Sequence, residues 1–348
     1  MKEAMLWKNI GKQEVLCYLC YRLCKIKPNE NGFCRIRKNI NGKLYAMTYG
    51  KAIAANIDPI EKKPFYHFMP SSPVFSLATV GCNFRCKFCQ NWEISQVPSG
   101  RIEGEDLPPK KIRDICAMQG VPGCSYTYTE PTVFMEYALD TAKLLRADGR
   151  FNVFVTNGYM TTAAINEMDK YIDASRIDLK GFDDRVYTDL SGDVKLEYVL
   201  NNIKELHKRQ HIEIITLLIP GYNTADSDIR QIAEWIHDLS PEIPLHFIAF
   251  YPAYQMLDTP PTDLETLRRA RKIALEEGLH YVYTGNRQDI ETESTYCPYC
   301  NTLVIKRWGF EVLENKLMPG ARCPECGKKL NFVLDINEYW KNKKSKKD

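Results

Sequence analysis

The stretch that decides the fold reads GCNFRCKFCQN and runs from Gly81 to Asn91. It places Cys82, Cys86 and Cys89 on one tight loop, where their thiolates can surround a single metal cluster. A tetrahedral zinc ion and an ordinary [4Fe–4S] cluster both normally take four protein ligands. No fourth cysteine lies near this loop in the sequence. Three ligands would leave one iron with an open position, which a cluster needs if it is to bind a small molecule and pass it an electron.

The alternative for this loop is a zinc site that is completed by a distant ligand such as His67, His246 or Cys124. The C-x3-C-x2-C spacing, with the aromatic Phe88 directly before the last cysteine, is far more specific than a lone C-x-x-C pair. We therefore expect an iron–sulfur cluster at this loop.

Strand and helix patterns alternate downstream of residue 74. Strands that are apolar nearly throughout and are separated by helices indicate parallel βαβ units that are buried on both faces. Six such units and a final strand predict an α/β fold with a complete or partial TIM-like (β/α)6 barrel. A doubly wound open sheet is the alternative, because periodicity does not separate the two. We expect strands at 74–80, 125–128, 152–156, 176–179, 213–219, 245–250 and 281–283, and helices at 108–119, 132–147, 161–171, 195–209, 225–238 and 263–277.

The composition excludes a membrane protein. The 348-residue chain has a net charge of +3 and is 44% hydrophobic, which is ordinary for a globular protein with a buried core. No apolar run has the length of a transmembrane helix, and the first residues lack the apolar core of a signal peptide. We therefore expect a cytoplasmic protein. In that reducing compartment its thirteen cysteines, most of them in three clusters, are expected to bind metals rather than form disulfides.

Two Cys-rich segments flank the barrel region. We divide the chain into an N-terminal metal-binding segment, a connector, the barrel, a zinc ribbon and a basic tail. These regions comprise residues 1–40, 41–73, 74–290, 291–336 and 337–348.

The C-terminal module carries the knuckles CPYC and CPECG on either side of a stretch rich in β-formers. Cys297, Cys300, Cys323 and Cys326 supply the four thiolates of a zinc ribbon, whose folding energy comes from the metal. An auxiliary iron–sulfur cluster is the alternative for these ligands.

The N-terminal segment contains Cys17, Cys20, Cys24 and Cys34 in the pattern C-x2-C-x3-C-x9-C. This is again one complete ligand set. The segment has too few apolar residues to fold unaided, so we expect a metal to hold it. Zinc and a second iron–sulfur cluster are both consistent with the spacing.

Polar residues stand at the C-terminal ends of several expected strands, where a β/α barrel carries its chemistry. Glu130 and Asn157 follow the second and third strands, and Asp178 and Lys180 belong to the fourth. Residues that are two positions apart on a strand point to the same side of the sheet. A carboxylate and an ammonium that are both directed into the barrel therefore need to pair with each other or with a charged ligand. Asn157 precedes a glycine, and an ordinary turn is the alternative for it.

The cysteine loop resembles the signature of the radical S-adenosylmethionine (SAM) enzymes. That resemblance implies a [4Fe–4S] cluster whose open iron binds the amino and carboxylate groups of SAM. It also implies reductive cleavage of SAM to methionine and a 5′-deoxyadenosyl radical, which abstracts hydrogen from a substrate. Phe88 would then flank the adenine or the cluster.

Pyruvate formate-lyase (glycyl-radical) activating enzymes resemble this chain at two further places. Asp178-Leu179-Lys180 matches their Asp-x-Lys, whose Lys contacts the SAM carboxylate. Tyr128-Thr129-Glu130-Pro131 stands at the place of their Gly-Gly-Glu-Pro, which binds the SAM amino group. Two side chains replace the two glycines of that motif. We count Glu130, Asn157, Asp178 and Lys180, with Phe88, as cofactor-binding candidates.

The order of the modules is similar to that of the AmmeMemoRadiSam-system radical SAM enzymes. In that order an N-terminal CxLCxRxC…GxCxxR (17–37) and an EKKPFYHF stretch (61–68) precede the cysteine loop, and a CPxC ribbon follows. The resemblance implies a protein or small-molecule substrate, an electron donor such as ferredoxin or flavodoxin, and Memo-like or AMMECR1-like proteins as partners.

A metal-stapled RNA- or protein-binding adaptor without SAM turnover is the alternative function. It would use the ribbon and the basic tail. The charged residues expected at neighbouring strand ends argue against it, because an adaptor does not need them, and nucleic acid is therefore not expected as a partner.

Overall fold

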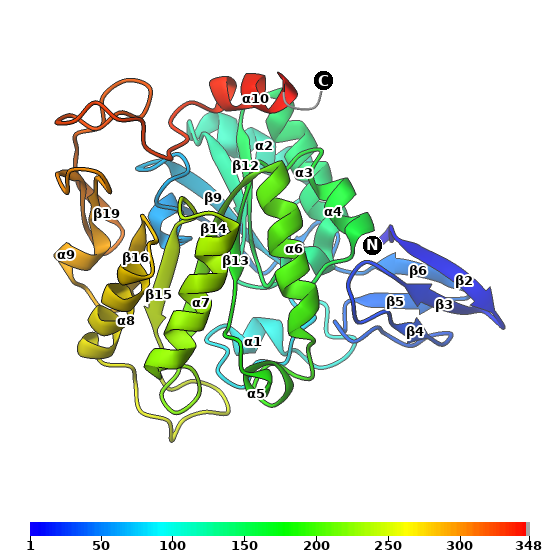
Figure 1. Ribbon diagram of the computed structural model, residues 1–348. Helices are drawn as coiled ribbons and strands as arrows, with labels where there is room; N and C mark the ends of the chain where they lie inside the picture. Colours follow the sequence, from blue (N-terminus) through cyan, green and yellow to red (C-terminus); the bar gives the residue numbers. More distant parts are fainter. Residues whose placement is uncertain (346–348) are drawn as a thin grey trace. The chain divides into compact units, whose positions relative to one another are not determined.

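The computed structural model describes residues 1–345 and has an α/β architecture (Figure 1). Its main sheet has eight mostly parallel strands in the order β16-β15-β14-β13-β12-β11-β9-β8. From β9 to β16 this order follows the chain without the reversal of a doubly wound sheet. Within the described residues, the end strands β8 and β16 do not pair with each other, so the sheet is open. The predicted partial barrel is confirmed, and the doubly wound alternative is wrong.

The strands of this sheet are β8 (Ala54–Pro59), β9 (Pro73–Ala78), β11 (Gly123–Tyr126), β12 (Phe151–Thr156), β13 (Ala174–Asp178), β14 (His211–Leu218), β15 (Leu245–Ala249) and β16 (Val282–Gly285). The chain forms two compact units. The first comprises residues 1–58, 73–175 and 197–210, and the rest of the described chain forms the second. Strands β8 and β13 each begin in the first unit and end in the second.

In the first unit, β11 pairs in parallel with β9 on one side and with β12 on the other. Every residue of β11 is buried, as the apolar pattern predicts for a central strand. Gly123 opens β11 because a Cβ there would lie 2.2 Å from the ring of Phe151. The helices of this unit are α1 (Trp92–Ser95), α2 (Pro109–Met118), α3 (Met135–Ala147), α4 (Thr162–Met168) and α6 (Leu196–Arg209), with a 3-10 turn η2 (Pro131–Phe134).

The first 58 residues contain several short strands that the sequence patterns did not predict (Figure 1). They form two small antiparallel sheets, ordered β2-β3-β4 and β1-β6-β5, and β7 pairs with β10. Val15, Ile26 and Leu44 are buried there. The strands within the first 58 residues are β1 (Lys2–Glu3), β2 (Trp7–Gly11), β3 (Glu14–Cys17), β4 (Lys25–Ile26), β5 (Arg37–Ile40), β6 (Lys43–Ala46) and β7 (Lys51–Ala52). The partner of β7, β10 (Glu105–Asp106), lies further along the chain.

In the second unit, β14 and β15 pair in parallel, as do β15 and β16. Helix α7 (Asp226–Leu239) buries Ile229, Ile232, Ala233 and Ile236, which recur on one face of a helix. The other helices are α5 (Asp184–Thr188), α8 (Leu264–Glu276), α9 (Ile290–Glu293) and α10 (Ile336–Ser345), with a 3-10 turn η1 (Ile60–Lys62). Helix α10 lies in the predicted basic tail, of which residues 346–348 are outside the described residues.

The C-terminal module of the second unit is a three-stranded antiparallel sheet of β17 (Thr295–Tyr296), β18 (Leu303–Trp308) and β19 (Glu311–Asn315). Arg307 of β18 is fully buried. Its guanidinium donates to the backbone oxygen of Tyr66 at 2.9 Å and to Oγ1 of Thr295 at 2.7 Å. The bond to Tyr66 attaches the ribbon to the 59–72 segment of the same unit, and the bond to Thr295 lies within the ribbon sheet.

A buried polar network surrounds Glu213 at the start of β14. The carboxylate accepts hydrogen bonds from the backbone N–H groups of Tyr66 and His67 and from the rings of His211 and His246. Burial alone would raise the pKa of Glu213, but the hydrogen bonds from the two histidines hold that pKa below its usual range.

Among residues 1–345, no helix has the length and apolar character that a bilayer crossing requires.

The buried side chain of His67 makes the free energy of unfolding depend on pH. Its Nδ1–H donates to the backbone oxygen of Asn331 at 2.7 Å, and its Nε2 accepts from the hydroxyl of Tyr283 at 2.6 Å. Burial lowers the pKa of His67 to about 3. The unfolded chain takes up a proton near pH 6.5, so the stability that neutral His67 contributes is complete above that pH and is lost as the pH falls below it.

From about pH 7.5 to about pH 5.5 we expect His67 to lower the free energy of unfolding by about 1 kcal/mol. His67→Gln should flatten this part of the pH dependence, measured by urea unfolding at both pH values. His237→Gln, which removes a half-exposed histidine of α7, is the matched control and should keep the wild-type slope. An unchanged slope in His67→Gln would contradict the assignment.

Candidate active site

The cysteine loop follows β9 and ends at helix α1. Its sulfurs already have hydrogen-bond partners: the Phe84 N–H donates to Sγ of Cys82 at 3.4 Å, and Sγ of Cys89 lies 3.2 Å from the hydroxyl of Ser95. Burial raises the pKa of Cys82, and the neighbouring charges of Glu130, Cys86 and Cys89 raise it further. Three clustered thiols in such a place need a positive metal centre to become thiolates, so this donor set fits a cluster.

Gly81 allows the N-terminal segment to pack directly on this loop. Its φ is +95°, and a Cβ would lie 2.7 Å from Cγ2 of Ile36 and 2.8 Å from the backbone oxygen of Cys34. Arg85, inside the loop, donates to the backbone oxygen of Phe33. The position of the cysteine loop therefore depends on residues 33–36.

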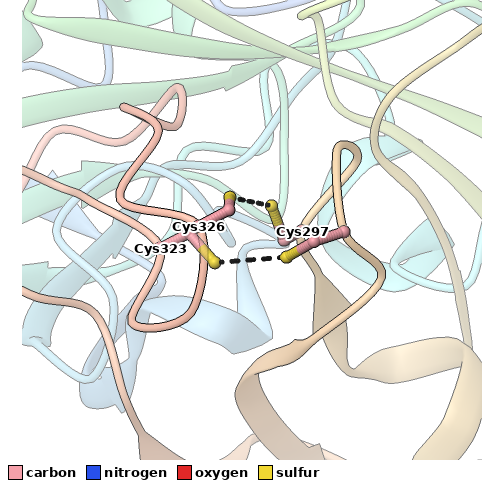
Figure 2. A group of neighbouring side chains, drawn as sticks. Cys297, Cys323 and Cys326 are labelled. Carbon is pink, nitrogen blue, oxygen red and sulfur yellow. Dashed lines mark hydrogen bonds between the residues drawn. The ribbon is translucent and has the colours of Figure 1, made fainter.

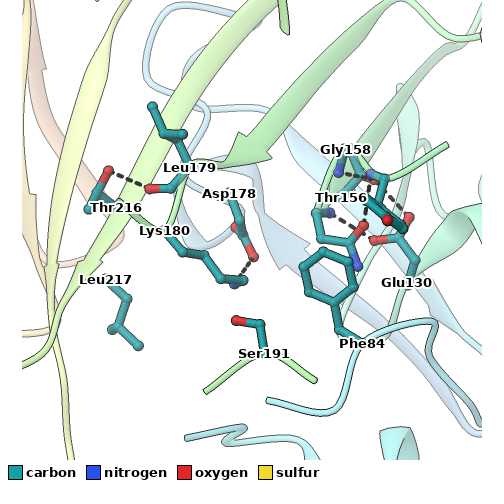
Figure 3. Close-up of polar contacts among 12 residues, drawn as sticks. Phe84, Glu130, Thr156, Gly158, Asp178, Leu179, Lys180, Ser191, Thr216 and Leu217 are labelled. Carbon is teal, nitrogen blue, oxygen red and sulfur yellow. Dashed lines mark hydrogen bonds and ion pairs between the residues drawn. The ribbon is translucent and has the colours of Figure 1, made fainter. Parts of the chain in front are cut away.

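Glu130 is buried, and its carboxylate is fully engaged by its own surroundings (Figure 3). One oxygen accepts from the N–H and hydroxyl of Thr132 at 3.0 and 2.6 Å and from the hydroxyl of Thr156 at 2.7 Å. The other accepts from the N–H of Asn157 at 2.8 Å. Burial raises the pKa of Glu130, and these hydrogen bonds counteract the increase. Glu130 therefore ties together the loops that follow β11 and β12.

Asn157 connects this carboxylate to the cysteine loop. Its side-chain N–H donates to Oδ1 of Asn83 at 2.8 Å, and its Oδ1 accepts from the N–H of Tyr159 at 3.0 Å. Asn83 directly follows Cys82 in the sequence. Asn157 therefore forms an ordinary turn, as the alternative interpretation predicts, and it also supports the cysteine loop.

Tyr128 adopts a backbone conformation that favours glycine. Its φ is +64°, a left-handed value that is uncommon for a bulky residue. Its hydroxyl donates to Asp58 at 2.5 Å, and its backbone oxygen accepts from the side chain of Asn91 at 3.0 Å. The segment thus keeps a glycine-like turn although a tyrosine occupies it.

In the second unit, Asp178 lies between two cations at the end of β13. Lys180 Nζ is 3.1 Å from one carboxylate oxygen (Figure 3). Arg176 forms an ion pair with the other oxygen. The predicted same-side arrangement of Asp178 and Lys180 is therefore observed, and they pair mutually. With Arg176 included, the group carries one excess positive charge.

The four C-terminal cysteines form a compact group (Figure 2). Sγ of Cys297 lies 3.7 Å from that of Cys326, and Sγ of Cys300 lies 3.6 Å from that of Cys323. All four sulfurs lie within 4.8 Å of one another. Zinc–sulfur bonds of about 2.3 Å place tetrahedral ligands roughly 3.8 Å apart, so the group fits a single metal ion.

The other predicted residues are also placed. Phe88 is buried in the first unit, and the four N-terminal cysteines line one cavity there. The sequence interpretation missed Gly81, Asn83 and Arg176. Arg176 could have been found, since it lies two residues before Asp178 and so shares its side of the strand.

Gly81→Ala should prevent the cysteine loop from reaching its place. An alanine with a positive φ lowers the free energy of unfolding by about 1 kcal/mol. The overlap of its Cβ with Ile36 and Cys34 lowers it by about 1–3 kcal/mol more. We expect the purified variant to hold less than about half of the wild-type iron and sulfide after anaerobic reconstitution.

Gly149→Ala is the matched control, because Gly149 has φ +76° and nothing lies within 4 Å of its Cβ position. It should bind iron like the wild type. Equal iron contents in the two variants would show that the close approach at Gly81 is not required.

Comparison with known proteins identifies relatives of this chain. The radical SAM superfamily pattern matches residues 76–236. An uncharacterised protein of Methanocaldococcus jannaschii is 44% identical over 337 residues, which are 96% of this chain and 100% of that protein. A pyruvate formate-lyase-activating enzyme of Staphylococcus aureus is 25% identical over 56% of this chain and 86% of its own length.

Among solved structures, a domain of a pyruvate-formate lyase-activating enzyme from Bacteroides vulgatus matches with a TM-score of 0.41 and 22% identity, over 47% of this chain and 98% of that one. The sequence relationships and the three-cysteine loop lead to one assignment: the chain belongs to the radical SAM superfamily of enzymes, a membership that implies a [4Fe–4S] cluster and SAM.

Proposed function

We propose that this enzyme binds a [4Fe–4S] cluster through Cys82, Cys86 and Cys89 and cleaves SAM reductively to methionine and a 5′-deoxyadenosyl radical. The cluster would supply the electron, and the radical would abstract hydrogen from the substrate. The observation that carries the proposal is the three-thiol loop after β9, held in place by the Asn157–Asn83 hydrogen bond. The protein's part is to hold and orient these groups.

The residues around Glu130 support a site for the SAM amino group. Glu130 fixes the turn that contains Tyr128, whose left-handed backbone replaces the glycines of the activating enzymes. Glu130 would act by positioning this turn, since its oxygens already accept four hydrogen bonds. Phe88 would flank the adenine or the cluster, and Asn157 would support the loop.

The charges on β13 support a site for the SAM carboxylate. Arg176, Asp178 and Lys180 carry one net positive charge, which a ligand carboxylate would neutralise. The backbone N–H of Lys180 donates to the hydroxyl of Tyr187 at 2.9 Å, and its backbone oxygen accepts from the side-chain amide of Asn223 at 2.8 Å. This support would keep the ammonium oriented.

The substrate class and the partners are proposals from sequence relationship. The likeness to activating enzymes favours hydrogen abstraction from a protein or a small molecule, with ferredoxin or flavodoxin as electron donor. Memo-like or AMMECR1-like proteins are the proposed partners. Zinc is the metal we propose for Cys297, Cys300, Cys323 and Cys326. Cysteines that serve as metal ligands suit a reducing compartment, and we propose a cytoplasmic location.

Cys86→Ala should abolish SAM cleavage. We expect anaerobically reconstituted wild type with dithionite to form 5′-deoxyadenosine, and the variant to form less than about one hundredth as much, because two thiolates do not retain the cluster. Chromatographic measurement of 5′-deoxyadenosine provides the test. Cys116→Ala, which removes a buried thiol of α2, should keep wild-type activity. Normal cleavage by a Cys86→Ala protein without a cluster would refute the mechanism.

Lys180→Met should weaken SAM binding without loss of the cluster. Removing one charge-assisted hydrogen bond to a carboxylate costs about 1.5 kcal/mol, so we expect KM for SAM to rise about tenfold. Lys272→Met, which alters a largely exposed lysine of α8, is the control and should leave KM unchanged. An unchanged KM in Lys180→Met would place the SAM carboxylate elsewhere.

A further inference from the structure

The four N-terminal cysteines gather around one cavity of the first unit. Cys17 ends β3, and Cys20 forms a β-bridge with Met160. Cys17, Cys20, Cys24 and Cys34 line the cavity together with Arg22, Arg37 and Phe33. Three of the four thiols are buried, and Cys24 is partly buried. Their chemistry is not used by the proposed SAM cleavage.

Backbone N–H groups point at three of these sulfurs. Phe33 N–H donates to Sγ of Cys24 at 3.4 Å, and the backbones of Arg22 and Ile36 hydrogen-bond to the sulfurs of Cys20 and Cys34. Hydrogen bonds to cysteine sulfurs are a standard feature of metal–thiolate centres, where they stabilise the negative charge. Such hydrogen bonds would stabilise the negative charge of metal-bound thiolates at these positions.

Arg37 supplies a buried positive charge beside the cavity. It is 1% exposed, and its Nη2 pairs with Glu136 at 2.9 Å. Its Nε and Nη1 have no hydrogen-bond partner. A buried guanidinium with unsatisfied N–H groups is costly unless an anionic group lies in the cavity that it lines. A metal centre with four thiolates is such a group.

The spacing of the sulfurs decides which metal centre fits. A single zinc ion draws its four sulfurs to roughly 3.8 Å from one another. The four C-terminal cysteines, Cys297, Cys300, Cys323 and Cys326, meet this condition. Nowhere else in residues 1–345 do the ligand atoms of three or more His, Cys, Asp or Glu residues all lie within 4.8 Å of one another. In a [4Fe–4S] cluster each cysteine binds a different iron, so the sulfurs stand further apart.

The cysteine loop of the first unit provides an internal comparison. The chain belongs to a superfamily whose members bind a [4Fe–4S] cluster at this loop. The sulfurs of Cys82, Cys86 and Cys89 also do not all lie within 4.8 Å of one another. The chain therefore contains one set of cysteines with the spacing of a single ion and two sets with wider spacing. In the spacing of their sulfurs, Cys17, Cys20, Cys24 and Cys34 resemble the cysteine loop and not the zinc ribbon.

We propose that Cys17, Cys20, Cys24 and Cys34 bind a second [4Fe–4S] cluster. This site is distinct from the SAM site and does not depend on SAM turnover. It lies against the first cluster's loop, since Arg22 Nε donates to the backbone oxygen of Asn83 at 2.9 Å and the Cys34 backbone contacts Gly81. Loss of this cluster would therefore also loosen the SAM loop.

Metal counting on a chain without the first cluster tests the proposal. After anaerobic reconstitution, Cys82→Ala/Cys86→Ala/Cys89→Ala should retain about four iron and four sulfide, with about one zinc in the ribbon. Reduction with dithionite should give the low-temperature EPR signal of a [4Fe–4S] cluster. Adding Cys20→Ala and Cys34→Ala to this chain should remove the iron, the sulfide and the signal, and leave the zinc.

Adding Cys116→Ala and Cys124→Ala to the same triple variant is the matched control, because it removes two buried thiols of the same unit. This chain should keep its iron. The wild type gives a second measurement that needs no variant, with an expected content of about eight iron and one zinc.

Two results would overturn the proposal. One is about two zinc and no iron in the triple variant, which would make the N-terminal site a zinc site. The other is iron that persists after Cys20 and Cys34 are replaced. If the wild type does not cleave SAM while the triple variant still holds about four iron, the proposed SAM mechanism is wrong and the proposal of a second cluster is unaffected.

Discussion

The buried carboxylate of Glu130 is the constraint on which the candidate site depends. It accepts four hydrogen bonds from three residues, so its charge is stabilised by oriented dipoles and not by a cation. One donor, Asn157, also holds Asn83 beside Cys82. Two strand ends and the cysteine loop are thereby fixed through one group. A cluster ligand set needs such rigid support, because small displacements of a ligand lower metal affinity.

The N-terminal segment contributes charge as well as packing to this site. Arg35 donates to the backbone oxygens of Gln96 and Val97, and Arg85 donates to those of Cys82, Phe84 and Phe33. Backbone oxygens satisfy the N–H groups of a guanidinium without neutralising its charge. Burial and the nearby Arg35 lower the pKa of Arg85, which is the expected sign of positive charges held close together. Anionic iron–sulfur centres beside these arginines would offset that repulsion.

The sequence predicted the parallel sheet because buried strands and amphipathic helices carry clear periodicities. The short strand Trp7–Gly11 was not predicted, since four of its five residues are exposed and leave no alternation. The support of the cysteine loop was not predictable either. Gly81 meets Ile36, and Asn83 meets Asn157, which are contacts between segments far apart in the chain. Glycine and asparagine read as turn residues until those neighbours are known. The cysteine sets were identified by spacing alone, but the distances between their sulfurs exist only in the fold.

Tyr128 shows how a motif can change its residues and keep its shape. The activating enzymes resembling this chain carry glycine at that turn, where a positive φ costs no strain. A tyrosine in the left-handed region costs about 1–2 kcal/mol. Here the hydroxyl of Tyr128 gains a hydrogen bond to the carboxylate of Asp58, and bonds to charged groups contribute about 1.5–3 kcal/mol. The two effects are of similar size, so the side chain anchors the conformation that it strains. The backbone oxygen of Tyr128 remains directed at Asn91, just beyond the last cluster cysteine, and the turn stays coupled to the loop without a glycine.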